Sequence, residues 1–241
     1  MKELKLTTLA IILGVCLIIS TMIGAGTFYK VRAMDNTLTV TGSAKTTITS
    51  DVAKWSSSFS RTVTVDNIKS GYADMAKDLD FVKKFFAKNG IAEKDLTFSP
   101  VFMDEQYKYN SDSNAPTEYM LRQNVTLQSN DVAKVTELAN NTQDMINNGV
   151  IFSPSAPEYY FTKLPETRIS LLSDAVKDAW QRADKIAESS NKKVNTIKAA
   201  SVGVTQVVPV NSLDISDYGA YDTSTIDKDV MITIKATFNM K

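Results

Sequence analysis

The chain opens with a long apolar segment that contains no charged residue between positions 6 and 29. Lys2 and Lys5 precede this segment, and Lys30 and Arg32 follow it. A helix rises about 1.5 Å per residue, so a run of this length can cross the roughly 30 Å hydrocarbon core of a bilayer. The pattern predicts a transmembrane helix.

We therefore expect three parts. Residues 1–30 form an N-terminal transmembrane anchor with a short cytoplasmic tail, residues 31–37 form a linker, and residues 38–241 form one extracytoplasmic domain.

Two other interpretations of the apolar segment are weaker. A cleaved signal peptide would use the basic start of the chain and the small residues at 24–26, but its apolar region is typically about 7–15 residues long. Lipidation at Cys16 would require a small residue before the cysteine, whereas Val15 is bulky and the apolar run continues past it. Cys16 is better explained as an apolar side chain in the membrane.

The orientation of the anchor does not follow from charge. Two basic residues flank each end of the segment, so the bias that normally selects the cytoplasmic side is absent. A short tail before the helix and a large domain after it are typical of a signal anchor. We expect a single-pass protein of the cytoplasmic membrane with its C-terminal domain extracytoplasmic, on the periplasmic or cell-surface side.

Beyond the linker, two stretches alternate apolar and polar residues, 38–44 and 51–65, with a polar connection at 46–50. This alternation predicts two strands that form a hairpin. Helical spacing follows, with Asp66 as the expected N-cap and Asn89-Gly90 as the stop.

The order of strand, helix and strand then repeats. A strand at 96–103, a tyrosine-containing loop at 107–114 and a strand at 119–127 precede a helix that starts after Asn130-Asp131. That helix ends at Asn148-Gly149, a joint of the same kind as Asn89-Gly90. The repetition indicates either an internal duplication or simply the general preference of helix ends for Asn-Gly.

A third, longer helix is predicted from Pro165 to Ser189, and alanine occupies every fourth position from Ala175 to Ala187. Such a ridge lets a helix approach its neighbour closely. Strands are expected at 192–204 and 230–238, with an acidic loop at 213–229 between them. The fold class is therefore α+β: a transmembrane helix, two strand-helix-strand units with a mainly antiparallel sheet, and a long third helix.

Composition removes several function classes. Lys+Arg and Asp+Glu both number 27, and five of the basic residues are arginines, so the electrostatic footprint of a nucleic-acid binder is missing. The chain has no histidine, and its one cysteine lies in the apolar segment. Zinc sites, Cys-His pairs and Ser-His-Asp triads are excluded on that basis.

No cofactor or metal site is expected either. The glycines do not form a phosphate-binding loop. Asp214, Asp217, Asp222, Asp227 and Asp229 do not follow the spacing of a calcium-binding loop, so we expect a solvated loop there. No carboxylate pair for acid-base catalysis can be assigned, and the sequence predicts no catalytic residue.

Tyrosines gather in the predicted loops and offer a different kind of site. A tyrosine side chain brings a large rigid area and a polar tip, which suits contact with another protein. The alternative is that these rings cap the ends of the core. The candidate contact residues are Tyr107, Tyr109, Tyr119, Tyr159, Tyr160, Tyr218 and Tyr221.

Several of these features together resemble the SIMPL-domain (DUF541) family of YggE-like periplasmic and envelope proteins, in particular a membrane-anchored subgroup. The resemblance rests on the segments Val40-Thr41-Gly42-Ser43-Ala44 and Asp51-Val52-Ala53-Lys54-Trp55, on Asn89-Gly90-Ile91, on Tyr107-Lys108-Tyr109, and on the alanine ridge at 175–187. It covers about residues 37–240.

The resemblance implies an extracytoplasmic α+β domain without a cofactor, a tendency to form homo-oligomers, a link to envelope or oxidative stress, and no catalytic residue to carry over. We therefore expect a non-enzymatic, membrane-anchored envelope protein that assembles with itself or with an envelope partner. The alternative is an extracytoplasmic binding module that holds a small molecule or an extended peptide in a tyrosine-edged groove.

Overall fold

The computed structural model describes residues 2–33, 36–107 and 116–241. Its contacts divide the chain into two compact units. Unit 1 contains residues 1–45, 168–205 and 231–241, and unit 2 contains residues 46–167 and 206–230. The fold is α+β, with an N-terminal apolar helix followed by mainly antiparallel sheets, as the sequence predicted.

The N-terminal helix α1 spans Lys2–Ala33. Its segment Thr7–Arg32, 26 residues long, is apolar and long enough to cross a membrane, and none of it is buried against the rest of the described chain. Hydroxyl groups within it bond back to the helix: Thr21 Oγ1 donates to the Leu17 carbonyl (2.5 Å) and Thr27 Oγ1 to the Ile23 carbonyl (2.8 Å). These bonds satisfy polar groups that would otherwise be costly in hydrocarbon.

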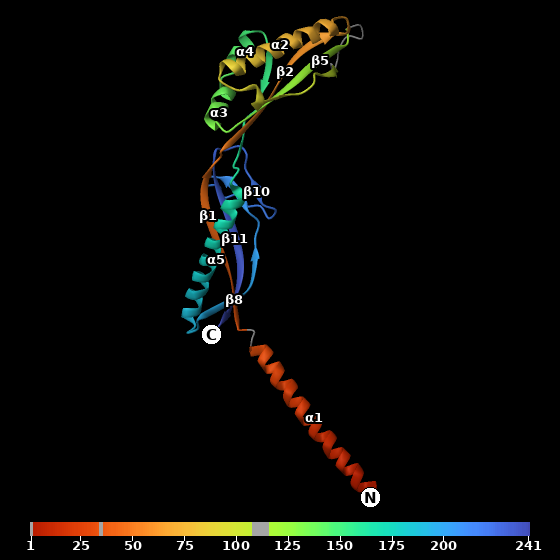
Figure 1. Cartoon of the computed structure of the whole chain (residues 1–241), viewed down its shortest axis with the longest axis vertical. Coiled ribbons are helices and arrows are strands. Elements are labelled where there is room, and N and C mark those ends of the chain that lie inside the picture. Colours follow the sequence, from red (N-terminus) through yellow and green to blue (C-terminus); the bar gives the residue numbers. More distant parts are fainter. Residues whose placement is uncertain (1, 34–35, 108–115) are drawn as a thin grey trace. The chain divides into compact units, whose positions relative to one another are not determined.

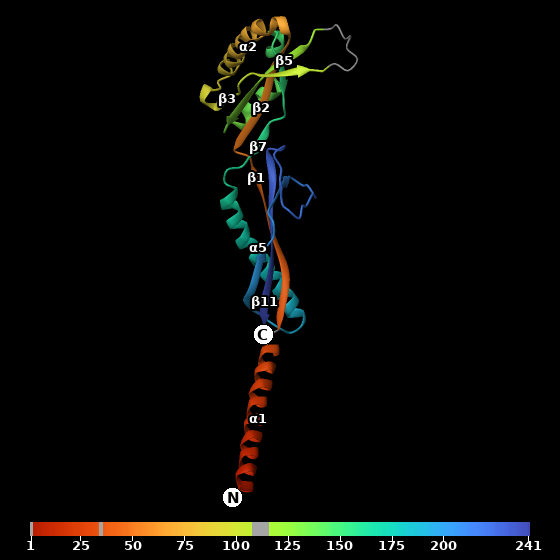
Figure 2. The ribbon, with the colours of Figure 1, turned by 90° about the vertical axis from the view of Figure 1, so that its right-hand side faces the viewer.

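Unit 1 is built from strands β1 (Thr37–Thr49), β8 (Val194–Val202) and β11 (Asp227–Met240) with helix α5 (Leu164–Ser189) alongside them (Figures 1 and 2). The parts of β1 and β11 that belong to this unit lie next to each other, and β8 pairs antiparallel with β11. The predicted third helix is confirmed and begins one residue earlier than expected, and the predicted C-terminal strand is confirmed and begins three residues earlier and ends two residues later.

The alanine ridge of α5 is the contact between helix and sheet in unit 1. Ala175, Ala179, Ala183 and Ala187 are all fully buried, as the spacing predicted. Gly42 of β1 lies directly against this ridge: a Cβ atom there would lie 2.5 Å from the Ala179 nitrogen and 2.7 Å from the Ala179 Cβ, and closer still to the Ala175 carbonyl oxygen. The helix backbone therefore approaches the strand backbone so closely that a side chain does not fit between them.

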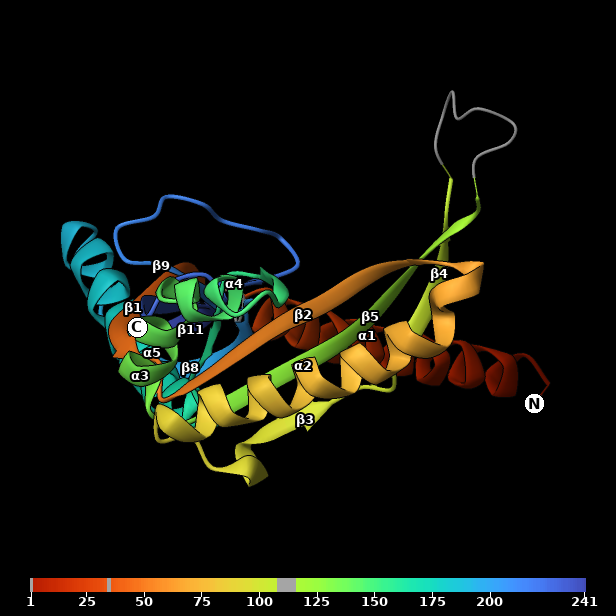
Figure 3. The same ribbon diagram turned by 90° about the horizontal axis from the view of Figure 1, so that it is seen from above.

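Unit 2 is organised around β2, which pairs antiparallel with β5 along nearly its whole length. β6 and β7 pair with the other edge of β2, and β3 and β4 pair with β5. Helices α2 and α3 pack against β2, and Figure 3 shows α2 running along the sheet beside β2 and β5. The bounds are β2 Val52–Thr64, α2 Ile68–Lys88, β3 Leu96–Phe98, β4 Phe102–Gln106, β5 Glu118–Ser129, α3 Val132–Asn140, α4 Gln143–Asn147, β6 Ile151–Pro154 and β7 Glu158–Tyr160.

An aromatic cluster fills the space between this sheet and α2. The Trp55 ring of β2 meets Phe86 of α2 and Phe152 of β6 edge to face, with centroids 6.0 and 5.9 Å apart. Its indole nitrogen donates to the Ser155 carbonyl at 2.9 Å. The indole therefore brings its apolar area into the core without leaving its one donor unpaired.

Two strand predictions are wrong. β1 and β2 do not form a hairpin, because β1 belongs to one sheet and β2 to the other. The predicted strand 96–103 is interrupted, since Pro100 lacks the N–H that a ladder needs, and it separates β3 from β4.

The helix starts are right in one case and wrong in another. Asp131 is an N-cap whose carboxylate accepts from the Lys134 nitrogen at 3.0 Å, whereas Asp66 lies inside a short 3-10 turn, η1 (Val65–Asn67), and Asn67 is the N-cap of α2. Both Asn-Gly stops are confirmed, with φ angles of 79° at Gly90 and 76° at Gly149.

The sequence pattern also did not predict the turn η2 (Glu93–Asp95) or the short strands β7, β9 (Gln206–Pro209) and β10 (Ala220–Tyr221). β9 and β10 pair in parallel. The single helix expected after Asn130 is in fact two helices, α3 and α4.

Replacing Gly42 by alanine should destabilise unit 1, although alanine elsewhere in a strand is usually neutral or favourable. The added methyl group would have to displace the backbone of α5, and overpacking of this kind costs about 1–3 kcal/mol. Thermal unfolding of the full chain in detergent should show a lower midpoint for Gly42→Ala. Thr41→Ala, on the exposed neighbouring position, is the matched control. Equal midpoints for the two variants would contradict the close approach.

Candidate functional site

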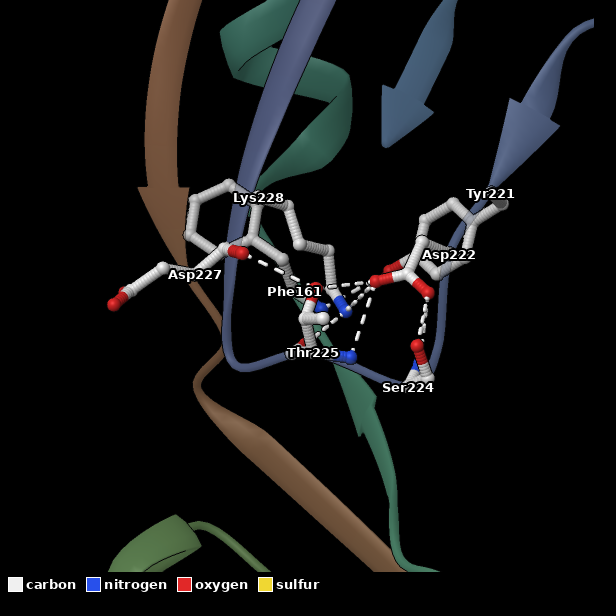
Figure 4. Close-up of polar contacts among 7 residues, drawn as sticks. All are labelled: Phe161, Tyr221, Asp222, Ser224, Thr225, Asp227 and Lys228. Atoms are coloured by element: carbon white, nitrogen blue, oxygen red, sulfur yellow. Dashed lines mark hydrogen bonds and ion pairs between the residues drawn. The ribbon is translucent and has the colours of Figure 1, made fainter. Parts of the chain in front are cut away.

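Several hydrogen bonds and an ion pair form a polar cluster in the loop between β10 and β11, which we call the Asp222–Lys228 cluster (Figure 4). One carboxylate oxygen of Asp222 accepts from the backbone nitrogen of Ser224 (3.0 Å) and from its hydroxyl (2.6 Å). The other accepts from the Thr225 nitrogen (3.1 Å) and also from the Thr225 hydroxyl. The short side chains that follow Asp222 thus fold the loop around its carboxylate.

Lys228 completes the cluster from β11. Its side chain is fully buried, with no exposed area, and Figure 4 shows it reaching toward Asp222. The ammonium lies 3.3 Å from Asp222 Oδ2 and also donates to the carbonyl of Thr225. Burial lowers the pKa of Lys228, and the charge and hydrogen bond of Asp222 act in the opposite direction.

Burial alone would raise the pKa of Asp222, but the hydrogen bonds from Ser224 and Thr225 outweigh it and hold that pKa well below the usual range. Asp222 is therefore a carboxylate at neutral pH, paired with an ammonium that no solvent-sized molecule reaches. Such a pair holds a loop in place. It does not present a nucleophile or a base to a substrate.

Two of the candidate tyrosines lie next to this cluster. The ring of Tyr221 stacks on that of Tyr160, with centroids 6.2 Å apart and planes 25° apart. The hydroxyl of Tyr221 accepts from the Phe161 nitrogen at 3.1 Å. Tyr160 donates to Glu158 at 2.8 Å, and this hydrogen bond is the main reason that the pKa of Tyr160 is raised. The structure thus brings Tyr160 and Tyr221 together at the surface of unit 2.

The other candidate tyrosines lie in different surroundings. Tyr159 is part of the core, and its hydroxyl lies 2.9 Å from that of Thr136. Tyr119 is half-buried on β5, opposite Val63. Tyr107 and Tyr218 are exposed, and Tyr109 lies outside the described residues.

An apolar surface, of which the sequence predicted Tyr218 alone as a contact residue, lies in the loop between β9 and β10. Leu213, Ile215 and Tyr218 are 94%, 72% and 97% exposed. We call these three side chains the β9–β10 loop surface. The signal was present in the alternation of apolar and acidic residues from Leu213 to Tyr218, but the acidic residues led to a solvated loop as the expectation.

That expectation is wrong for two of the five aspartates. Asp222 is bound in the cluster, and Asp229 is 2% exposed, with its carboxylate accepting from the Thr47 hydroxyl (2.8 Å) and from the Asn211 nitrogen (3.2 Å). Both residues fix the backbone of this region. Within the described residues, no group of three or more acidic or cysteine side chains is placed to hold a metal ion.

A polar pocket of about 360 Å³ opens elsewhere in unit 2, where the end of β2 meets the start of α2. Arg61 is its cationic wall, and Asp78 of α2 holds the guanidinium with two hydrogen bonds of 2.5 and 2.7 Å. The pair fixes the guanidinium in one orientation. The remaining lining comes from Thr62, Val63, Thr64, Asn67, Ser70, Gly71, Asp74 and Glu118.

Comparison with known proteins identifies one family. The family model described as "SIMPL: Protein of unknown function (DUF541)" matches residues 38–238. A comparison with curated proteins gives no match.

Among solved structures, the chain has a weak similarity to an amidase of the hydantoinase/carbamoylase family from Burkholderia phymatum. The identity is 10%, the TM-score is 0.29, and the match covers 48% of this chain and 32% of that protein. This chain thus spans about a third of the amidase, and a similarity of this size carries no argument about fold or activity.

The two members of the buried ion pair should respond unequally to substitution. Asp222→Asn removes the charge that faces a fully buried ammonium, and leaving such a charge unpaired costs about 3–5 kcal/mol. Lys228→Met leaves Asp222 with its four hydrogen-bond donors from Ser224 and Thr225, so the free energy of unfolding should fall by about 1 kcal/mol. Chemical denaturation of the full chain measures both, and the double variant should recover most of the Asp222→Asn loss. Equal losses for the two single variants would contradict this account.

The Asp222–Lys228 pair should also make the free energy of unfolding depend on pH. The folded-state pKa of Asp222 lies below its ordinary value of 3.8, so its contribution is complete above that value and is lost as the pH falls through the folded-state pKa. The folded-state pKa of Lys228 lies below 10.5, so stability should rise with pH as the unfolded chain approaches that value. Both slopes should be smaller in the double variant than in the natural chain.

Proposed function

The chain belongs to the SIMPL (DUF541) family, and on that premise we propose that it is a non-enzymatic envelope protein held in the cytoplasmic membrane by α1. In this proposal the folded part is extracytoplasmic and associates with itself or with an envelope partner. The link to envelope or oxidative stress that the resemblance implies belongs to the same proposal.

The observation that carries the proposal is the exposure of α1. Its apolar side chains are covered by no other element of the described chain. An apolar helix of this length has a lower free energy in a bilayer than in water. The hydroxyls of the segment bond internally, which is compatible with a surrounding without water.

The contact surface that we propose is the β9–β10 loop surface. Large apolar side chains exposed within one loop favour protein contact. The Asp222–Lys228 cluster anchors the C-terminal part of this loop region, and Gln206 Nε2 donates to the Ser216 carbonyl inside it (2.6 Å). A loop held at these points can present its apolar side chains with a small loss of conformational entropy on binding.

Membrane fractionation tests the anchor. The full chain should stay with membranes after extraction with alkaline carbonate, and its N-terminal sequence should begin before Thr7. External protease on spheroplasts should degrade the folded part. A soluble chain that begins after Gly26, or a folded part protected from external protease, would contradict the proposal.

Light scattering of the chain in detergent tests self-association. The natural chain should be larger than a monomer, and Leu213→Ser/Ile215→Ser/Tyr218→Ser should shift it toward the monomer because the apolar contact is removed. The control carries three substitutions at other exposed apolar positions of unit 2, Val65→Ser/Ile146→Ser/Ile151→Ser. A natural chain that is monomeric at high concentration would contradict self-association.

A binding module is the second candidate, favoured by the pocket beside Arg61. Its volume lies within the range of small-ligand sites, and its lining combines the Asp78-bound guanidinium of Arg61 with hydroxyl groups, one amide and the carboxylates of Asp74 and Glu118. A thermal-shift screen with small polar compounds, both cationic and anionic, tests it, because a ligand at 100 times its dissociation constant adds about 2.7 kcal/mol. A shift that disappears in Ser70→Ala would support this function.

A further inference from the structure

We propose that the end of unit 1 nearest to α1 binds the anionic phospholipid head groups of the bilayer that holds α1. This inference rests on the proposed membrane anchor. It adds that the folded part has a second, electrostatic contact with the same membrane.

Hydrogen bonds gather three chain segments at this end of unit 1. The Met240 nitrogen donates to the Asn36 carbonyl (2.9 Å), and Lys192 Nζ donates to Asn36 Oδ1 (2.7 Å). Lys193 and Lys241 are joined by two reciprocal backbone hydrogen bonds of 2.8 and 2.9 Å. The turn before β8 and the end of β11 are therefore fixed beside Asn36.

The chain itself limits how far this end can move from the membrane. Three peptide links join Ala33, the last residue of α1, to Asn36, so their Cα atoms can be no more than about 11 Å apart. This limit holds for any relative orientation of α1 and the folded part. The residues bonded to Asn36 thus remain close to the point where α1 leaves the bilayer.

The side chains at this end are mainly cationic. Lys192, Lys193 and Lys241 are exposed, and Lys30 and Arg32 lie in the last turn of α1. The acidic residues nearest to them along the chain are Asp35 and Glu188, and Glu188 bonds to Lys185 (2.9 Å). A surplus of positive charge remains for the phosphate groups of lipids.

The different charges of the two units also support a contact between unit 1 and anionic lipids. From Asn36 onward, unit 1 has ten lysines and arginines against four acidic residues, whereas unit 2 has thirteen against twenty-one. The formal net charge of zero thus divides into a basic unit, which follows the anchor, and an acidic unit. An anionic bilayer surface attracts the first and repels the second.

A second copy of the chain, through its acidic unit 2, is the other possible occupant of this basic end. The bilayer is favoured because α1 keeps it within reach at all times, which gives lipid head groups a high effective concentration. Contact between exposed charges also fades beyond a Debye length, about 8 Å at physiological ionic strength, and the short connection keeps these lysines near that range.

The test uses the full chain in vesicles, with Cys16→Ser and a nitroxide spin label on Ser189→Cys in the last turn of α5. A nickel-chelating lipid relaxes the label according to its distance from the head groups. Relaxation should be stronger in vesicles of phosphatidylcholine with phosphatidylglycerol than in phosphatidylcholine alone. The additional relaxation should be lost at high salt and in Lys192→Gln/Lys193→Gln/Lys241→Gln.

Two further variants separate charge from folding. Lys193→Gln/Lys241→Gln keeps the bond between Lys192 and Asn36 and should still lose most of the additional relaxation. Lys69→Gln/Lys84→Gln/Lys94→Gln removes three exposed lysines of unit 2 and should behave as the natural chain.

The outcomes that overturn the inference are distinct. Equal relaxation in the two kinds of vesicle overturns it and leaves the anchor intact, provided that the chain floats with the vesicles. A chain that does not float overturns the anchor and this inference together. Additional relaxation that depends on the number of chains per vesicle assigns the basic end to a second copy, and the lipid contact is then wrong.

Discussion

The apolar surface of α1 is the constraint on which the rest of this protein depends. Its side chains meet no other element of the described chain, so their cover has to come from outside it. For a helix of this length and composition the bilayer is the surrounding that requires no additional partner. Under the proposed anchoring, the folded part works beside a membrane and is attached there through a connection of a few residues.

Within that condition, the two units are stabilised in different ways. Unit 1 relies on a close approach of backbones, alanine against glycine, which leaves little room for side chains and fixes α5 on the strand. Unit 2 relies on an aromatic core around Trp55 and on a buried ion pair that holds the loop before β11. The family description supplies no activity, so the proposals for function rest on the exposed β9–β10 loop surface and on the pocket beside Arg61.

Most of the elements that the sequence predicts correctly depend on local patterns. Asn-Gly at two helix ends, the alanine ridge of α5 and the alternation in β11 each depend on residues close together in the chain. The errors concern distant partners. The polar connection after β1 has the composition of a hairpin turn, but the partner of β1 is β11, nearly two hundred residues later. The local pattern predicts that Asp222 is one solvated aspartate among five, because nothing in it shows that Lys228 is buried beside Asp222.

The same limit explains why the charge of this protein was misleading as a whole-chain property. A formal net charge of zero says nothing about how charge is divided in space. Unit 1 is assembled from three separate segments, and its surplus of lysine becomes visible when these segments are grouped by the fold. The basic unit is the one that contains the chain directly after the apolar helix, and the proposed contact with anionic lipid depends on this unequal division of charge.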